Sequence, residues 1–173
     1  QHDGQFRMGG EPYINHLIRV GESAHLHNGF AFGREIGWCH DLLEDQMKEY
    51  DVKHHVLLVK LMAFGYREIH AKKIVNHVLD LTNQYTKEAY PDLNRSERKK
   101  LEHERLSLIN YDSQTMKCFD IIDNAYDMFE QNNYFGLTWL REKVNLLQVM
   151  NQSNCNVRDK CWSVVSKELI KYA

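Results

Sequence analysis

Apolar positions recur along the chain at helical spacing, and no segment alternates apolar and polar residues well enough to predict a strand. Only two prolines and nine glycines interrupt this pattern, which favours long helices. We expect helix boundaries to hold to about 2–4 residues. The predicted helices span 12–27, 31–46, 52–64, 66–81, 97–109, 114–132, 135–150 and 157–172.

Two irregular stretches separate these helices. Glycines and Pro12 break the segment 4–12, and Pro12 suits the first turn of the helix that follows. The segment 82–94 is polar and contains Pro91, so we predict a loop there, and long loops are often functional. The expected helix caps are Asn94 or Ser96 for the helix after this loop, and Asp112 or Ser113 for the next.

The length of 173 residues and the hydrophobic fraction of 43% fit one domain with its own core. We find no repeat and no linker, so the predicted fold is an all-α, single-domain, irregular helical bundle covering residues 1–173. Apolar residues of the C-terminal helices, within 135–172, are typical of a core or of a subunit contact, which leaves a homo-oligomer open.

Charge and cysteine spacing exclude several classes of protein. The net charge of −2 does not indicate a nucleic-acid partner. No signal peptide or membrane-length apolar span occurs, so we expect no membrane partner. The four cysteines form no C-x-x-C pair, which argues against a thiolate zinc site and suits a reduced, cytoplasmic setting.

Two polar stripes interrupt otherwise apolar helices. On an ideal helix the polar residues of 40–45 share one face, and the carboxylates of 120–127 follow one line at spacings of three and four. Carboxylates placed so close together repel one another, and a bound cation would relieve this repulsion. The alternative is a solvated polar face in each case, and a packed histidine at His16. The stripes contain His40, Asp41, Glu44 and Asp45, and Asp120, Asp123, Asn124 and Asp127.

Three ordered motifs together resemble a known family. Residues 2–16 read HDGQFRMGGEPYINH, residues 40–45 read HDLLED and residues 117–124 read KCFDIIDN. This order resembles the RelA/SpoT-type HD hydrolase domain, with its G-Q-x-R-x-x-G-E-P-Y-I-x-H, H-D-x-x-E-D and K-x-A-D-x-x-x-N motifs. Weaker similarity lies at 81–82 and 97–100, and the whole covers about residues 2–130.

The resemblance implies a divalent metal, usually manganese in this family, and a water-activating pair of carboxylates. It also implies a small nucleotide substrate, with removal of the 3′-pyrophosphate of guanosine tetra- or pentaphosphate as the reaction. The implied metal ligands are His16, His40, Asp41 and Asp120. The implied proton-transfer groups are Glu44 and Asp45, and the implied nucleotide contacts are Arg7 and Asn124.

Three positions depart from the family pattern. Met8 replaces a common basic residue, Asp123 replaces a histidine or tyrosine, and Asp127 replaces a nucleotide-binding threonine. All three make the expected substrate pocket less positive. Asp127 would instead accept hydrogen bonds from an amino or hydroxyl group of the substrate. A basic run at 95–105 is either a solvated helix face or an attractor of phosphates.

Three hypotheses follow. The first is a guanosine polyphosphate 3′-pyrophosphohydrolase. The second is an HD phosphohydrolase for another nucleotide or a small phosphoester, which the changes at Met8 and Asp127 favour. The third is a non-catalytic binding protein on a degenerate HD scaffold. The complete set of metal-ligand and acid residues argues against it.

Overall fold

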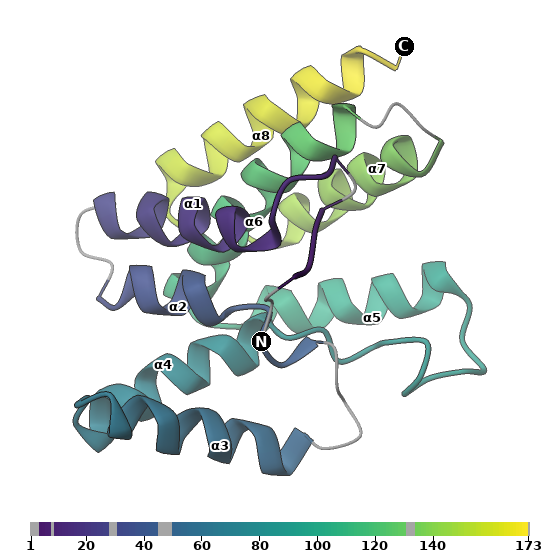
Figure 1. Ribbon diagram of the computed structural model, residues 1–173. Coiled ribbons are helices and arrows are strands. Elements are labelled where there is room, and N and C mark those ends of the chain that lie inside the picture. Colours follow the sequence, from purple (N-terminus) through teal and green to yellow (C-terminus); the bar gives the residue numbers. More distant parts are fainter. Residues whose placement is uncertain (1–3, 8, 28–30, 45–49, 131–133, 173) are drawn as a thin grey trace.

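The computed structural model describes residues 4–7, 9–27, 31–44, 50–130 and 134–172. These residues form an all-helical fold, and the only bridge between extended residues in the described part joins Phe6 to Pro12 (Figure 1). The predicted all-α class is confirmed. The helices are α1 (Tyr13–Leu26), α2 (Gly33–Cys39), α3 (Tyr50–Ala63), α4 (Glu68–Leu81), α5 (Arg95–Leu108), α6 (Tyr111–Glu130), α7 (Tyr134–Val149) and α8 (Cys155–Ile170).

The long helix α6 lies at the centre of the packing (Figure 1). It contacts α1, α4, α7 and α8, while α1 packs on α2, α3 on α4 and α5 on α7. Side chains from nearly all helices therefore meet in one core, which includes Ile36, Ile74, Met116, Ile121 and Leu140, all fully buried. No helix in the described ranges is long and apolar enough to cross a membrane.

The ends of the helices are set by local hydrogen bonds and not by the periodic pattern of apolar residues. Asn94 caps α5 through a reciprocal pair of hydrogen bonds with Glu97, as one of the two expected caps. The predicted cap of α6 was wrong. Asn110, rather than Asp112 or Ser113, accepts the hydrogen bond from the Ser113 N–H at 3.0 Å, so the helix begins earlier than expected.

The predicted helix over 31–46 was also wrong, because α2 ends at Cys39. His40 Nδ1 contacts the Gly37 carbonyl oxygen at 2.7 Å. A continuing helix would use that carbonyl to accept the N–H of Asp41. The chain instead forms tighter turns, with hydrogen bonds from the Leu42 N–H to Cys39 and from the Glu44 N–H to Asp41. Asp41 and Glu44 are thus placed by turns, and not by a shared helix face.

Candidate metal centre

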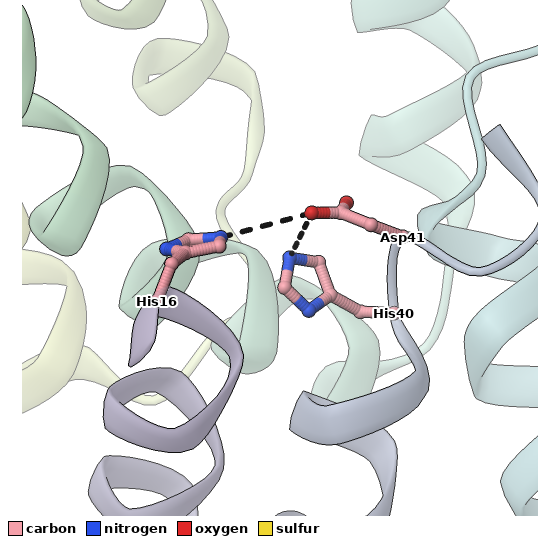
Figure 2. Close-up of side chains that lie close together, drawn as sticks. All are labelled: His16, His40 and Asp41. Atoms are coloured by element: carbon pink, nitrogen blue, oxygen red, sulfur yellow. Dashed lines mark ion pairs between the residues drawn. The ribbon is translucent and has the colours of Figure 1, made fainter. Parts of the chain in front are cut away.

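Two histidines and an aspartate meet where α1 and α2 pack together (Figure 2). His16 lies in the first turn of α1, while His40 and Asp41 directly follow α2. One ligand atom of each residue lies within 4.8 Å of the others. Both histidines are buried and Asp41 is partly buried. The helices can approach this closely because Gly21 and Gly37 face each other without side chains.

Asp120 of α6 completes what we call the His–Asp cluster, defined as His16, His40, Asp41 and Asp120. Its Oδ1 atom lies 3.4 Å from His16 Nε2 and 3.5 Å from His40 Nε2. Asp41 Oδ2 lies 3.7 Å and 3.1 Å from the same two nitrogens. The structure therefore brings all four expected metal ligands to one point.

Both imidazoles are held so that Nε2 points into the cluster. His40 Nδ1 donates to the Gly37 carbonyl oxygen, and His16 Nδ1 donates to Asp123 Oδ2 at 2.7 Å. Both Nε2 atoms are buried, and within the described part of the chain neither makes a hydrogen bond of acceptable geometry. A polar atom buried in this way calls for a partner. Two imidazole nitrogens and two carboxylates fit a divalent transition metal, so the residues present suit the implied ion.

The charges of the cluster are strongly interdependent. Burial alone would lower the pKa of His16, but the carboxylates of Asp120, Asp123 and Asp41 raise it to about 10. The pKa of His40 is raised for the same reason against the same burial. The pKa of the Asp41 carboxyl is lowered by His40 and His16, although burial opposes this. The cluster therefore favours a positive charge between its carboxylates. A metal ion would compete with protons for this position.

One buried and two partly buried polar side chains hold the two aspartates. The Tyr13 hydroxyl donates to Asp41 Oδ2, and Lys117 Nζ lies 2.8 Å from Asp120 Oδ2. Asn124 Nδ2 donates to Asp120 Oδ1 at 2.5 Å. Lys117 stands three residues before Asp120 on α6, which is the spacing of side-chain neighbours on a helix. Sequence reasoning assigned no role to Tyr13, although it lies inside the first motif.

Glu44, the expected proton-transfer group, lies beside the cluster. Burial and the charge of Asp41 raise its pKa to about 7, against the opposite influence of Lys117. Its Oε1 accepts a hydrogen bond of 2.7 Å from Asn83, the second residue of the loop after α4. A carboxyl group with a pKa near neutrality is suited to proton transfer. Asp45, the other expected group, lies outside the described residues, as does Met8.

Comparison with known proteins gives no match. No protein-family model, curated protein or solved structure is significantly similar to this chain. The function must therefore be argued from the site itself.

Arg7 and Asn124, both expected to contact the nucleotide, contact each other. Arg7 Nη2 donates to Asn124 Oδ1 at 2.8 Å. Its Nη1 donates to Asp123 Oδ2 at 2.7 Å, and its Nε donates to Asp127 Oδ2 at 3.0 Å. The structure thus brings Arg7 against the expected substrate residues of α6, and each of these residues has a protein partner.

A basic groove lies between α5 and α7. A cavity of about 640 Å³ there is lined by Lys99, Lys100 and Arg141, among others. An adjoining cavity of about 230 Å³ also includes Lys99 and extends to Asn83, the partner of Glu44. The basic run is therefore only partly a solvated face. One of its members, Arg105, is instead bonded to Glu102 and to backbone carbonyls.

Proposed function

We propose that this protein is a metal-dependent phosphohydrolase of the HD type. One observation carries the proposal: two buried imidazole nitrogens and two carboxylates, from three separated parts of the chain, converge beside an acid whose pKa is about 7. The ligand set suits manganese, iron or zinc, and manganese is the first candidate because of the family resemblance. The metal would be held by His16, His40, Asp41 and Asp120.

A divalent cation, when bound, supplies Lewis-acid polarisation of a phosphate oxygen and acidifies a water molecule. The residues of the chain supply the rest. Glu44 accepts the proton of the attacking water and returns one to the leaving oxygen. Asn83 holds the Glu44 carboxyl in place. The Lys117 ammonium keeps Asp120 ionised, since burial alone would raise the pKa of Asp120 and Lys117 lowers it.

For the substrate, we propose a purine nucleotide with a 3′-phosphate or 3′-pyrophosphate, with guanosine tetraphosphate as the first candidate. The cations of the α5–α7 groove support a polyanionic ligand. Burial, together with repulsion from Arg95 and Lys117, lowers the pKa of Lys99, which lines the groove, although Glu142 acts in the opposite direction. An anion in the groove would relieve this repulsion.

A second candidate is an HD phosphohydrolase for a less phosphorylated nucleotide or a small phosphoester. The observation that favours it is the engagement of Arg7, whose three donor nitrogens already meet protein oxygens. Two of these oxygens belong to carboxylates. A highly charged ligand would therefore find fewer available cations on this side of the cluster.

Metal-titrated melting and a nucleotide panel test the proposal. We expect manganese, zinc, iron, cobalt or nickel to raise the melting temperature of the full chain, and His40→Ala to abolish the response. Hydrolysis of guanosine tetraphosphate, nucleoside mono- and triphosphates, NADPH and a simple phosphoester would then be compared with manganese added. Absence of any metal response would overturn the site. A tenfold preference for another substrate, about 1.4 kcal/mol, would overturn the substrate only.

A further inference from the structure

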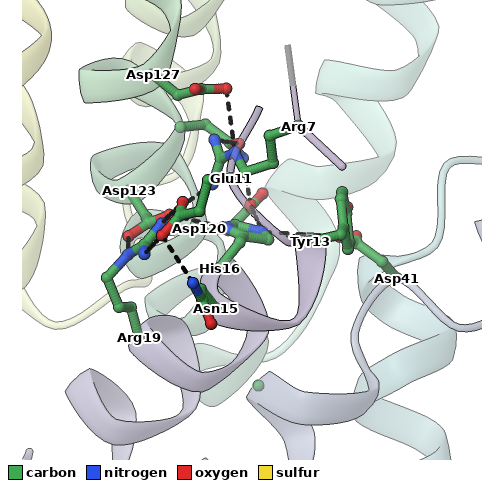
Figure 3. Close-up of polar contacts among 12 residues, drawn as sticks. Arg7, Glu11, Tyr13, Asn15, His16, Arg19, Asp41, Asp120, Asp123 and Asp127 are labelled. Carbon is green, nitrogen blue, oxygen red and sulfur yellow. Dashed lines mark hydrogen bonds and ion pairs between the residues drawn. The ribbon is translucent and has the colours of Figure 1, made fainter. Parts of the chain in front are cut away.

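Asp123 of α6 lies just outside the His–Asp cluster and accepts hydrogen bonds from three side chains (Figure 3). Its Oδ2 accepts from His16 Nδ1 and from Arg7 Nη1, each at 2.7 Å. Its Oδ1 accepts from Arg19 Nε at 2.6 Å. The side chain is only 14% exposed. A carboxylate that accepts from the distal nitrogen of a metal-binding histidine fixes the tautomer and the orientation of the ring.

The positive charges of two arginines offset the negative charge of Asp123, which lies close to two further acids. Arg7 is 4% exposed at its side chain and lies between Asp123 and Asp127. Arg19, on the solvent side, bridges Asp123 to Glu11. Buried charges need partners with good geometry, and here each oxygen of Asp123 meets a guanidinium.

Backbone hydrogen bonds in the segment before α1 hold Arg7 in this position. The Arg7 N–H donates to the Glu11 carbonyl at 2.8 Å, and the Gly10 N–H donates to the Arg7 carbonyl at 2.9 Å. The Tyr13 N–H donates to the Gln5 carbonyl at 2.9 Å. These bonds draw the described residues on either side of Arg7 together. The Arg7 side chain is thus fixed from both its backbone and its guanidinium.

We infer that Asp123 is a positioning residue that orients His16 toward the metal, and that Arg7 acts through Asp123 and not as a contact to the substrate. The inference rests on the proposed metal site. It departs from the expectation that Arg7 binds the nucleotide, because all three of its donor nitrogens point at oxygens of α6. The inference also explains why an acid stands at position 123, where the family pattern has a histidine or tyrosine.

The test measures the affinity for manganese alone, by calorimetric titration of the metal-free full chain. Asp123→Asn keeps the shape but removes the charge, and loss of such a partner typically lowers metal affinity about 10–100-fold. Asp127→Asn is the matched control: it also removes a carboxylate from Arg7 on the same helix, but it does not touch His16. We expect its metal affinity to be unchanged. Melting of each metal-free variant separates this effect from general destabilisation.

Arg7→Gln supplies the second readout. If Arg7 acts through Asp123, the substitution lowers manganese affinity in the wild type and has no further effect in Asp123→Asn, so the two changes are not additive. A raised KM with unchanged metal affinity in Arg7→Gln would make Arg7 a substrate contact and overturn the inference. If Asp123→Asn does not fold, Arg7→Lys is measured instead, since lysine cannot reach all three acceptors. Unchanged metal affinity there also overturns it.

The two proposals fail in different ways. A wild-type chain that binds no divalent metal overturns both the site and the role of Asp123. A wild-type chain that binds manganese, with Asp123→Asn and Asp127→Asn binding equally well, overturns only the role of Asp123 and leaves the His–Asp cluster intact.

Discussion

Asn83 Nδ2 donates a 2.7 Å hydrogen bond to Glu44 Oε1, although the two residues are 39 positions apart. The loop that carries Asn83 is anchored at its start. Glu102, buried in α5, accepts from the backbone N–H groups of Gln84 and Tyr85, each at 3.1 Å. Arg105 in turn holds Glu102 at 3.0 Å. The position of Glu44 beside the His–Asp cluster is therefore fixed by α5 as well as by its own turn.

Glu44→Gln is expected to keep the fold and the metal but to lose most turnover. An amide cannot accept the proton of the attacking water, and general acid–base groups typically contribute about 10²–10⁴-fold. The measurement is kcat with manganese added, alongside metal-titrated melting. Asn83→Ala, which releases Glu44 without removing it, should cost less. Near wild-type turnover in Glu44→Gln would show that another group transfers the proton.

Lys117→Met is expected to destabilise the protein by about 3–5 kcal/mol, because it removes the ammonium partner of a buried carboxylate. Lys117 Nζ lies 2.8 Å from Asp120 Oδ2, and both side chains are 8% exposed. Urea unfolding of the metal-free chain measures the loss. The matched control is Lys72→Met, which breaks an exposed pair with Glu68 and should cost far less, because solvent screens exposed pairs. Equal losses in both variants would contradict the prediction.

The helical fold was largely predictable because its signals are local. Apolar spacing identified the helices, and Asn94 was one of the two caps expected for α5 from residue type. The end of α2 was not predictable in this way. It depends on the His40 side chain contacting the Gly37 carbonyl, and a side chain that takes a backbone acceptor leaves no periodic signal.

The members of the site were predictable from spacing and resemblance, but their partners were not. His16 and Asp123 are 107 positions apart, and only the packing of α1 on α6 brings them together. The carboxylate at 123 was visible in the polar stripe of α6, but only as a departure from the family pattern. A contact between distant positions depends on how whole helices pack, and the local pattern of residues does not predict that packing.

Gly37→Ala is expected to weaken both the fold and the metal site. A Cβ atom at Gly37 would lie 2.4 Å from Gly21 Cα and 2.6 Å from Gly21 N, and these backbone atoms cannot move without α1. Overpacking of this kind costs about 1–3 kcal/mol or more. Because His16 lies on α1 and His40 bonds to Gly37, separation of the helices should also lower manganese affinity.

The control for Gly37→Ala is Gly65→Ala. Gly65 has a φ of +96° and open space around its Cβ position. Alanine there is strained, by about 1–2 kcal/mol, but Gly65 lies between α3 and α4, which carry no residue of the cluster, so manganese affinity should not change. Urea unfolding and calorimetric titration measure both quantities. A Gly37→Ala protein with wild-type metal affinity would show that α1 and α2 adjust without moving the histidines.

His103→Gln is expected to reduce the loss of stability in mild acid. Burial and the nearby ammonium groups of Lys143 and Lys99 lower the pKa of His103 to about 4, from an ordinary value of 6.5, although Glu142 and Glu102 act in the opposite direction. Between these two values the unfolded chain binds a proton that the folded chain does not. The free energy of unfolding therefore falls as pH drops through this window, and the contribution is fully present only above 6.5. Glutamine does not titrate, so urea unfolding near neutral pH and at about pH 5 should show a smaller difference in the variant. The comparison at neutral pH is the internal control, since both side chains are uncharged there. An equal loss of stability in the two proteins would mean that His103 is already protonated in the folded state.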